Sequence, residues 1–197
     1  DMIVEARLSR DKNETLSEDI AQGLQTIESR SSGLVDFIQA TKKLRQIPDP
    51  EFTKISCNEL FKQVSLLIDP IFKQKNISFT MQIDPEDLVL LIDKKLMEQT
   101  LINLLTNAME ATEKVSHPEI SLTAWQTGDH HVCLSVADNG EGILPENIER
   151  VFMPHFTTKA NGSGIGLSLA RRIMHLHRGS IAAKSEPGAY TEMVLRF

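Results

Sequence analysis

The spacing of apolar residues near the start of the chain predicts one long helix. From Thr15 to Ile47, apolar side chains recur at steps of three and four, which places them on one side of an α-helix. A helix of about 30 residues is about 45 Å long and cannot bury such a stripe alone. We favour a helical bundle that forms a dimer over an amphipathic helix packed on its own domain. Pro48 and Pro50 end the pattern and predict domains at 1–50 and 51–197.

The rest of the chain mixes strand and helix patterns. Alternation or short apolar runs predict strands, and steps of three and four predict helices. The expected strands are 52–56, 77–83, 88–92, 120–126, 132–137, 179–185 and 191–197. The expected helices are 58–74, 94–114 and 164–177, with a short helix near 145–150. Asp93 is placed to cap the second helix, and Pro70 is expected to kink or end the first.

Composition limits the class of protein. Of the 197 residues, 41% are hydrophobic and 24% charged, as in ordinary globular proteins. No apolar run approaches the ~20 residues that span a bilayer, and no signal peptide is evident. The net charge of −6 argues against a nucleic-acid partner, which usually requires a basic patch. Cys57 and Cys133 lack metal-binding spacing, so we expect free thiols and a cytoplasmic location, although two cysteines also permit one disulfide.

Two glycine clusters predict a nucleotide site. Asp138-Asn139-Gly140-Glu141-Gly142 follows an expected strand, and Gly162-Ser163-Gly164-Ile165-Gly166 leads into an expected helix. Glycine permits positive φ and the close approach of a ligand to the main chain, and a helix N-terminus offers free N–H groups to phosphate. Leu167 stands where a dinucleotide fingerprint needs glycine, and no Walker sequence occurs. Those two classes of nucleotide site are therefore excluded.

Two asparagines in the expected helix 94–114 form a candidate metal site. Asn103 and Asn107 are four residues apart, so their amides lie on the same side of the helix. Asparagine is unfavourable inside a helix, and two at this spacing require an explanation. One explanation is a pair of surface amides bonded locally. We favour the other, in which amide oxygens bind Mg²⁺ together with phosphate oxygens and water.

Read together, these blocks resemble the ATP-binding domain of sensor histidine kinases. That family belongs to a superfamily that includes DNA gyrase, heat-shock chaperones and mismatch-repair proteins. Residues 103–111 (NLLTNAMEA) resemble its N box, 138–142 its first G box, 152–159 its F box and 162–169 its second G box. The resemblance covers residues 52–197. It implies an α+β fold of the Bergerat type, a two-layer α/β sandwich with a mixed, mostly antiparallel sheet covered by helices.

The resemblance also implies roles for individual residues. Asp138 would accept a hydrogen bond from the adenine amino group of ATP, which suits an acceptor-only carboxylate. Asn107, supported by Asn103, would hold Mg²⁺, and Lys159 would lie near the phosphates. We expect Asn107 and Lys159 to be the catalytic residues. The other expected nucleotide contacts are Gly140, Gly142, Thr157, Thr158, Gly162, Ser163, Gly164, Ile165, Gly166 and Leu167.

The expected reaction is phosphoryl transfer to histidine. Hydrolytic members of the superfamily carry a glutamate base where this chain has Asn103, and an amide cannot take a proton from water. The resemblance implies a two-component sensor kinase that phosphorylates a histidine of the dimerisation domain and then a response regulator. It implies a homodimer through the N-terminal helix, and leaves membrane anchoring of the parent protein open. The alternatives are an anti-sigma-type serine kinase and a non-catalytic nucleotide-sensing scaffold.

The histidines of this chain do not supply the acceptor. None of the six precedes His117, and none lies in an H-box context, so we expect the acceptor outside this sequence. His155 stands in the F box where the family more often has Phe, and we assign it no catalytic role. We interpret the other histidines as surface or helix-cap residues.

Overall fold

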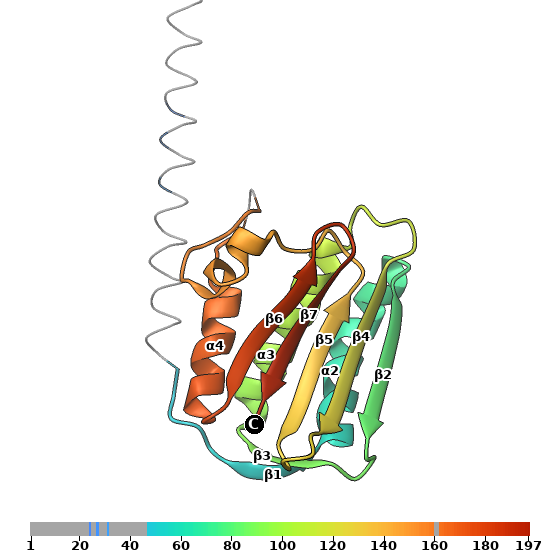
Figure 1. The fold of residues 1–197 in the computed structure, drawn as a ribbon, viewed down its shortest axis with the longest axis vertical. Helices are drawn as coiled ribbons and strands as arrows, with labels where there is room; N and C mark the ends of the chain where they lie inside the picture. Colours follow the sequence, from blue (N-terminus) through green and yellow to red (C-terminus); the bar gives the residue numbers. More distant parts are fainter. Residues whose placement is uncertain (1–23, 25–26, 28–30, 32–46, 160–161) are drawn as a thin grey trace, which may run out of the picture. The chain divides into compact units, whose positions relative to one another are not determined.

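The computed structural model describes residues 24, 27, 31, 47–159 and 162–197 (Figure 1). The chain divides into two compact units, residues 1–45 and 46–197. In the first unit, Leu24, Ile27 and Ser31 are helical and exposed. Of the rest of the predicted helix 15–47, only Ile47 is described, and it is not helical, so the dimerisation hypothesis stays a prediction.

The described part of the second unit is built on a five-stranded sheet and a two-stranded sheet. The larger sheet has the strand order β2 (Ser78–Asp84), β4 (Glu119–Gln126), β5 (Val132–Asp138), β7 (Tyr190–Arg196), β6 (Ser180–Glu186). β2 is parallel to β4, and all other neighbours are antiparallel. The small sheet pairs β1 (Thr53–Ser56) with β3 (Val89–Ile92). The predicted mixed, mostly antiparallel sheet is confirmed.

Three helices cover one face of the larger sheet, as Figure 1 shows. They are α2 (Cys57–Gln74), α3 (Lys94–Ala111) and α4 (Gly166–Leu176). Their apolar sides meet the inner face of the sheet in one core, which includes the fully buried side chains of Phe61, Leu101, Leu105, Leu122, Leu134 and Leu195. The predicted α+β class and two-layer arrangement are therefore confirmed. Cys57 and Cys133 are buried free thiols, and burial raises the pKa of Cys57 to about 11.

The predicted helix boundaries agree with α2 and α4 to within two residues and differ more at the end of α3. α2 continues through Pro70 to Gln74, so the proline does not end it. α3 begins after Asp93, whose Oδ1 accepts a hydrogen bond from the Leu96 amide at 3.0 Å, as predicted. It ends at Ala111, earlier than predicted, where the Thr112 hydroxyl donates to the carbonyl of Ala108 at 3.1 Å.

The segment after the first glycine cluster is more irregular than expected. In place of one short helix near 145–150, the chain forms two 3₁₀ turns, Pro145–Asn147 and Arg150–Phe152. The Arg150 guanidinium lies 4.5 Å from the centre of the Phe156 ring. This cation–π contact ties the second turn to the loop that follows it.

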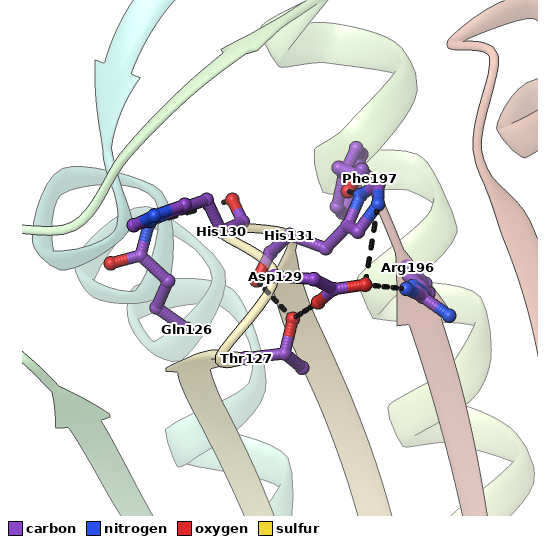
Figure 2. A network of polar contacts seen from close by, with 7 residues as sticks. All are labelled: Gln126, Thr127, Asp129, His130, His131, Arg196 and Phe197. Atoms are coloured by element: carbon purple, nitrogen blue, oxygen red, sulfur yellow. Dashed lines mark hydrogen bonds and ion pairs between the residues drawn. The ribbon is translucent and has the colours of Figure 1, made fainter.

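The β4–β5 hairpin carries an exposed polar network at the end of β5 remote from Asp138 (Figure 2). Oδ2 of Asp129 lies 2.5 Å from Nη2 of Arg196, and the Thr127 hydroxyl donates to Oδ1. The Thr127 bond, then the charges of Arg196 and His131, lower the pKa of Asp129 below its usual value. Nδ1 of His131 also lies 2.6 Å from the Phe197 oxygen. The network fastens the hairpin to the end of β7, and it includes two surface histidine positions as expected.

No helix in the described residues combines the length and apolar character needed to cross a lipid bilayer.

Candidate functional site

A polar row crosses the end of the sheet face that lies beneath the helices. In register, Asp138, Thr191 and Ser185 occupy the neighbouring strands β5, β7 and β6. Two residues further along these strands, the equivalent positions hold the core residues Val136, Met193 and Ala183. Because residues two apart in a strand share a face, the row lies on the same face as the core. The inner face therefore changes from apolar to polar where β5 ends.

Asp138 is a buried carboxylate at this end of the sheet. Its side chain is 8% exposed, and its Oδ1 accepts a hydrogen bond from the Gly140 amide at 2.9 Å. Burial raises the pKa of Asp138 to about 6, opposed by the Gly140 bond and by the charge of Lys159. The group is thus mostly ionised at neutral pH and offers hydrogen-bond acceptors only.

The first glycine cluster fits closely between α3 and the β6–β7 turn. A Cβ at Gly140 would lie 2.6 Å from the carbonyl oxygen of Ala111. Gly142 has φ +70°, and a Cβ there would lie 2.3 Å from the carbonyl oxygen of Glu186. The amide of Glu141 donates to the Ala111 carbonyl at 3.1 Å. Glycine is therefore required at both positions by space, and at Gly142 also by backbone conformation.

One side of α3 carries the predicted asparagines. The N-terminus of α4 packs against Asn103, since a Cβ at Gly166 would lie 2.2 Å from the Asn103 Oδ1. Nδ2 of Asn103 is buried and has no hydrogen-bond partner. Asn107 follows one turn later, and Glu110 after it forms an ion pair with Lys159. The spacings of four and three residues place these three side chains on the same side of the helix.

The loop before α4 folds back on itself. The His155 amide donates to the Gly164 carbonyl at 2.8 Å, and Gly164 has φ +65°. A Cβ at Gly164 would lie 2.5 Å from the His155 carbonyl carbon. The Thr157 hydroxyl accepts from the Lys159 amide at 3.1 Å, and a Cβ at Gly162 would lie 2.3 Å from that hydroxyl. Glycine at 162 and 164 thus allows the loop to double back.

The N-terminus of α4 has no side-chain cap. Its first N–H groups therefore lack both an intrahelical and a side-chain acceptor, as a phosphate site requires. Ile165 is buried before it, Leu167 is partly buried, and Ser163 and Thr158 are exposed. Among the described contacts, none joins Ser163 or Thr158 to another predicted site residue.

The structure thus brings most of the predicted residues to one region. Contacts link Asp138 to Gly140, Gly140 to the end of α3, Asn103 to Gly166, and Lys159 to the α3 surface beside Asn107. Glu110, Thr191 and Ser185 belong to the same region and were not predicted. Their sequence positions follow ordinary helix and strand patterns, so no local signal could have found them.

His177 is the C-cap of α4, as expected of a histidine at a helix end, and it is buried at 8% exposed. Its Nε2 accepts a hydrogen bond from the Asp93 amide at 2.9 Å, and its Nδ1 lies 2.8 Å from the Ile173 oxygen. The ring is therefore neutral with the proton on Nδ1, and it joins the end of α4 to the start of α3.

Comparisons with known proteins agree with this geometry. A family model described as histidine kinase-, DNA gyrase B- and HSP90-like ATPase matches residues 92–197. The chain belongs to this ATPase family. The resemblance to sensor histidine kinases seen in the sequence is confirmed, because curated relatives are named sensor histidine kinases or signal transduction histidine-protein kinases. The signal transduction histidine-protein kinase AtoS of Escherichia coli (strain K12) is 34% identical over 138 residues, which cover 70% of this chain and 22% of AtoS.

Solved structures place this ATPase domain among histidine kinases. The catalytic domain of histidine kinase ThkA, in a nucleotide-free form, matches with a TM-score of 0.67 at 34% identity and covers 75% of this chain and 95% of that chain. A structure of ThkA in complex with the response regulator protein TrrA matches with a TM-score of 0.71 at 30% identity, over 87% of this chain and 48% of that chain. The chain spans between 20% and 45% of the length of the curated relatives it matches.

Proposed function

We propose that this ATPase domain binds Mg·ATP and serves a sensor histidine kinase of a two-component system. The γ-phosphoryl group passes to a histidine outside this sequence and then to an aspartate of a response regulator. One observation carries the proposal. Asp138 is a buried, mostly ionised acceptor on which the charge of Lys159 acts, and Lys159 pairs with Glu110, which follows Asn107 on the same side of α3.

Asp138 selects the base. An ionised carboxylate accepts from the adenine amino group and cannot donate to the carbonyl that guanine carries at the same place. Gly140 and Gly142 stand where any side chain would meet the Ala111 and Glu186 carbonyls, so they let the loop after Asp138 fit closely between α3 and the end of β6. The raised pKa of Asp138 indicates a poorly solvated carboxylate, which gains from a donor that the ligand supplies.

The uncapped N-terminus of α4 receives the phosphates. Its free amides and dipole attract anions, and Gly162, Gly164 and Gly166 let the loop before it pack closely against Thr157, His155 and Asn103. Lys159 exchanges Glu110 for a phosphate oxygen when the nucleotide binds. The other predicted contacts, which complete the same surface, are Thr157, Thr158, Ser163, Ile165 and Leu167.

The amides of α3 hold the magnesium ion. The described residues contain no group of three or more His, Cys, Asp or Glu side chains that could bind a metal alone. Mg²⁺ commonly keeps several bound waters and takes only one or two protein ligands in addition to substrate phosphates. Asn107 and Asn103 are therefore enough as protein ligands. The buried amide of Asn103 without a partner fits this role, since rotating the amide exchanges its nitrogen and oxygen. When bound, the ion neutralises phosphate charge.

The chain's own residues favour transfer over hydrolysis. Asn103 carries no group that takes a proton from water, so the bound nucleotide waits for an external nucleophile. Lys159 and Asn107 orient the phosphates for attack by an imidazole nitrogen, and catalysis is mostly positioning. We also propose that residues 1–50 belong to a dimerisation and phosphotransfer domain and that the domain works in the cytoplasm. The ThkA–response regulator complex supports a response-regulator partner.

Binding of a non-hydrolysable ATP analogue with Mg²⁺ tests the site. We expect Asp138→Asn to weaken binding by about 10- to 100-fold, because the amide turns one acceptor into a donor. Asp129→Asn is the matched control, since it removes an exposed carboxylate from the remote hairpin and should leave affinity unchanged. Equal affinity of the Asp138 variant and the unmodified chain would disprove the assignment.

Phosphate transfer tests the reaction. A separately added helix that carries an H-box histidine should receive labelled phosphate from ATP, and the product should be acid-labile. An acid-stable product on serine would favour the serine-kinase alternative. No transfer to either acceptor, despite tight nucleotide binding, would favour the non-catalytic scaffold.

A further inference from the structure

We propose that Ser185 sets the base selectivity of this site by fixing the direction of the Thr191 hydroxyl proton. The inference rests on the proposed nucleotide function and concerns a residue that need not touch the nucleotide. Ser185 acts as a positioning residue, and through it the surface beside Asp138 presents hydrogen-bond acceptors only.

The three side chains lie in one row of the sheet. Thr191 is the register partner of both Asp138 on β5 and Ser185 on β6. Thr191 is 5% exposed and Asp138 8%, so both are shielded from water. Oγ of Ser185 lies 3.1 Å from Oγ1 of Thr191, within hydrogen-bond distance. A buried hydroxyl such as that of Thr191 normally forms a hydrogen bond. Which of the two hydroxyls donates decides whether the Thr191 proton is available to a ligand.

Counting protons gives that direction. The Ser185 hydroxyl donates to the Tyr190 carbonyl at 2.7 Å and accepts from the Ile143 amide at 2.8 Å. A hydroxyl has one proton and two lone pairs. Since the Ser185 proton is used by Tyr190, the bond between the hydroxyls requires Thr191 to be the donor. The Thr191 proton thus points away from Asp138, and its remaining lone pairs are acceptors.

The backbone around Ser185 maintains this arrangement. The Ile143 amide belongs to the segment that follows the first glycine cluster, and the Tyr190 carbonyl belongs to the first residue of β7, next to the β6–β7 turn. A second bond, from the Gly188 amide to the Glu141 carbonyl at 2.7 Å, ties the same two segments together. Ser185 therefore has a fixed donor and a fixed acceptor, and its proton is not free to turn toward Thr191.

A surface of acceptors discriminates between purines. Adenine carries an amino group with two N–H donors at C6, whereas hypoxanthine and guanine carry a carbonyl oxygen there. Beside Asp138 and a Thr191 oxygen whose proton is already used, a 6-oxo group finds no donor. If Ser185 did not hold that proton, the Thr191 hydroxyl could rotate and donate to the 6-oxo oxygen. Ser185 thus raises the preference for adenine over 6-oxo purines.

The test compares ATP with ITP, which differ at the base, on the full chain with Mg²⁺. Dissociation constants are measured by competition with a fluorescent nucleotide. We expect Ser185→Ala to lower the ratio Kd(ITP)/Kd(ATP) by about five- to tenfold, the value of one hydrogen bond. Ser185→Thr keeps the hydroxyl and should preserve the ratio. In a Thr191→Val background, Ser185→Ala should change both constants by the same factor, because no hydroxyl proton remains to be released.

The outcomes separate this inference from the proposed function. If the unmodified chain bound neither nucleotide, the proposed function would be wrong. If it bound ATP and Ser185→Ala weakened both nucleotides equally, Ser185 would serve only to hold the Ile143 segment, and the inference would be overturned. Ser185→Cys, which keeps the size with a weaker donor and acceptor, should lower the ratio in the same direction and replaces the alanine variant if that fails to fold. An unchanged ratio in the folded cysteine variant would also overturn the inference.

Discussion

Replacing Asp138 with asparagine should change how the stability of the nucleotide-free protein depends on pH. The pKa of Asp138 rises from 3.8 to about 6 on folding, because the carboxyl group is buried. The folded protein therefore binds this proton more tightly than the unfolded chain does. The resulting stabilisation is fully present below the unfolded pKa and is lost as pH rises through the folded pKa.

These two pKa values set the magnitude. By linkage, protonation of Asp138 adds about 1.4 kcal/mol to the free energy of unfolding at pH 5 and about 0.1 kcal/mol at pH 7. The unmodified chain should thus gain about 1.3 kcal/mol relative to Asp138→Asn when the pH falls from 7 to 5. The asparagine keeps an oxygen for the Gly140 amide and has no charge to titrate, so this gain belongs to the carboxyl group.

Urea unfolding at the two pH values measures the difference. Trp125 is the single tryptophan of the chain and lies in β4, so its fluorescence reports on the unit that contains the site. Asp129→Asn is the control. The pKa of that exposed carboxyl is lowered below 3.8 in the fold, so its contribution is lost only below this pH range, and Asp129→Asn should show the same gain between pH 7 and 5 as the unmodified chain. Parallel pH profiles for the unmodified chain and Asp138→Asn would refute the reasoning.

Two further substitutions test the surroundings of the site. Gly142→Ala places a Cβ 2.3 Å from the Glu186 carbonyl oxygen at φ +70°, so it should cost about 1–3 kcal/mol of unfolding free energy and weaken ATP-analogue binding, both measured by titration. Gly128→Ala, whose Cβ meets nothing within 4 Å, is its control, and equal effects would contradict the steric argument. Glu110→Gln removes the ion pair with Lys159 and should tighten ATP-analogue binding about two- to fivefold. This factor corresponds to the free energy that an exposed ion pair usually contributes. The same change in a Lys159→Met background should have a smaller effect, and an undiminished effect would show that the ion pair is not the cause.

The sequence by itself determined most of the elements and the position of the candidate binding loops. The alternation of a strand and the spacing of a helix depend only on residues two to four positions apart in the sequence, so both can be recognised without the tertiary structure. The two glycine clusters could also be predicted to form tight turns, because positions where the fold leaves no room for a side chain are occupied by glycine in the sequence. Asp138 could be identified because it ends a strand and begins a glycine cluster. Pro70 does not end α2, and the apolar spacing, which predicted a helix to residue 74, was the better guide to its end.

Only the tertiary structure decided which distant groups complete the site. The bond that joins His177 to Asp93 connects residues 84 positions apart, and neither residue's neighbours indicate it. Thr191 and Ser185 occupy alternating positions in ordinary strands, and register alone places them beside Asp138. Glu110 pairs with Lys159 across 49 positions for the same reason. Hydrogen bonds and charges act at short distance in space, so their partners follow from strand order and helix packing rather than from spacing along the chain.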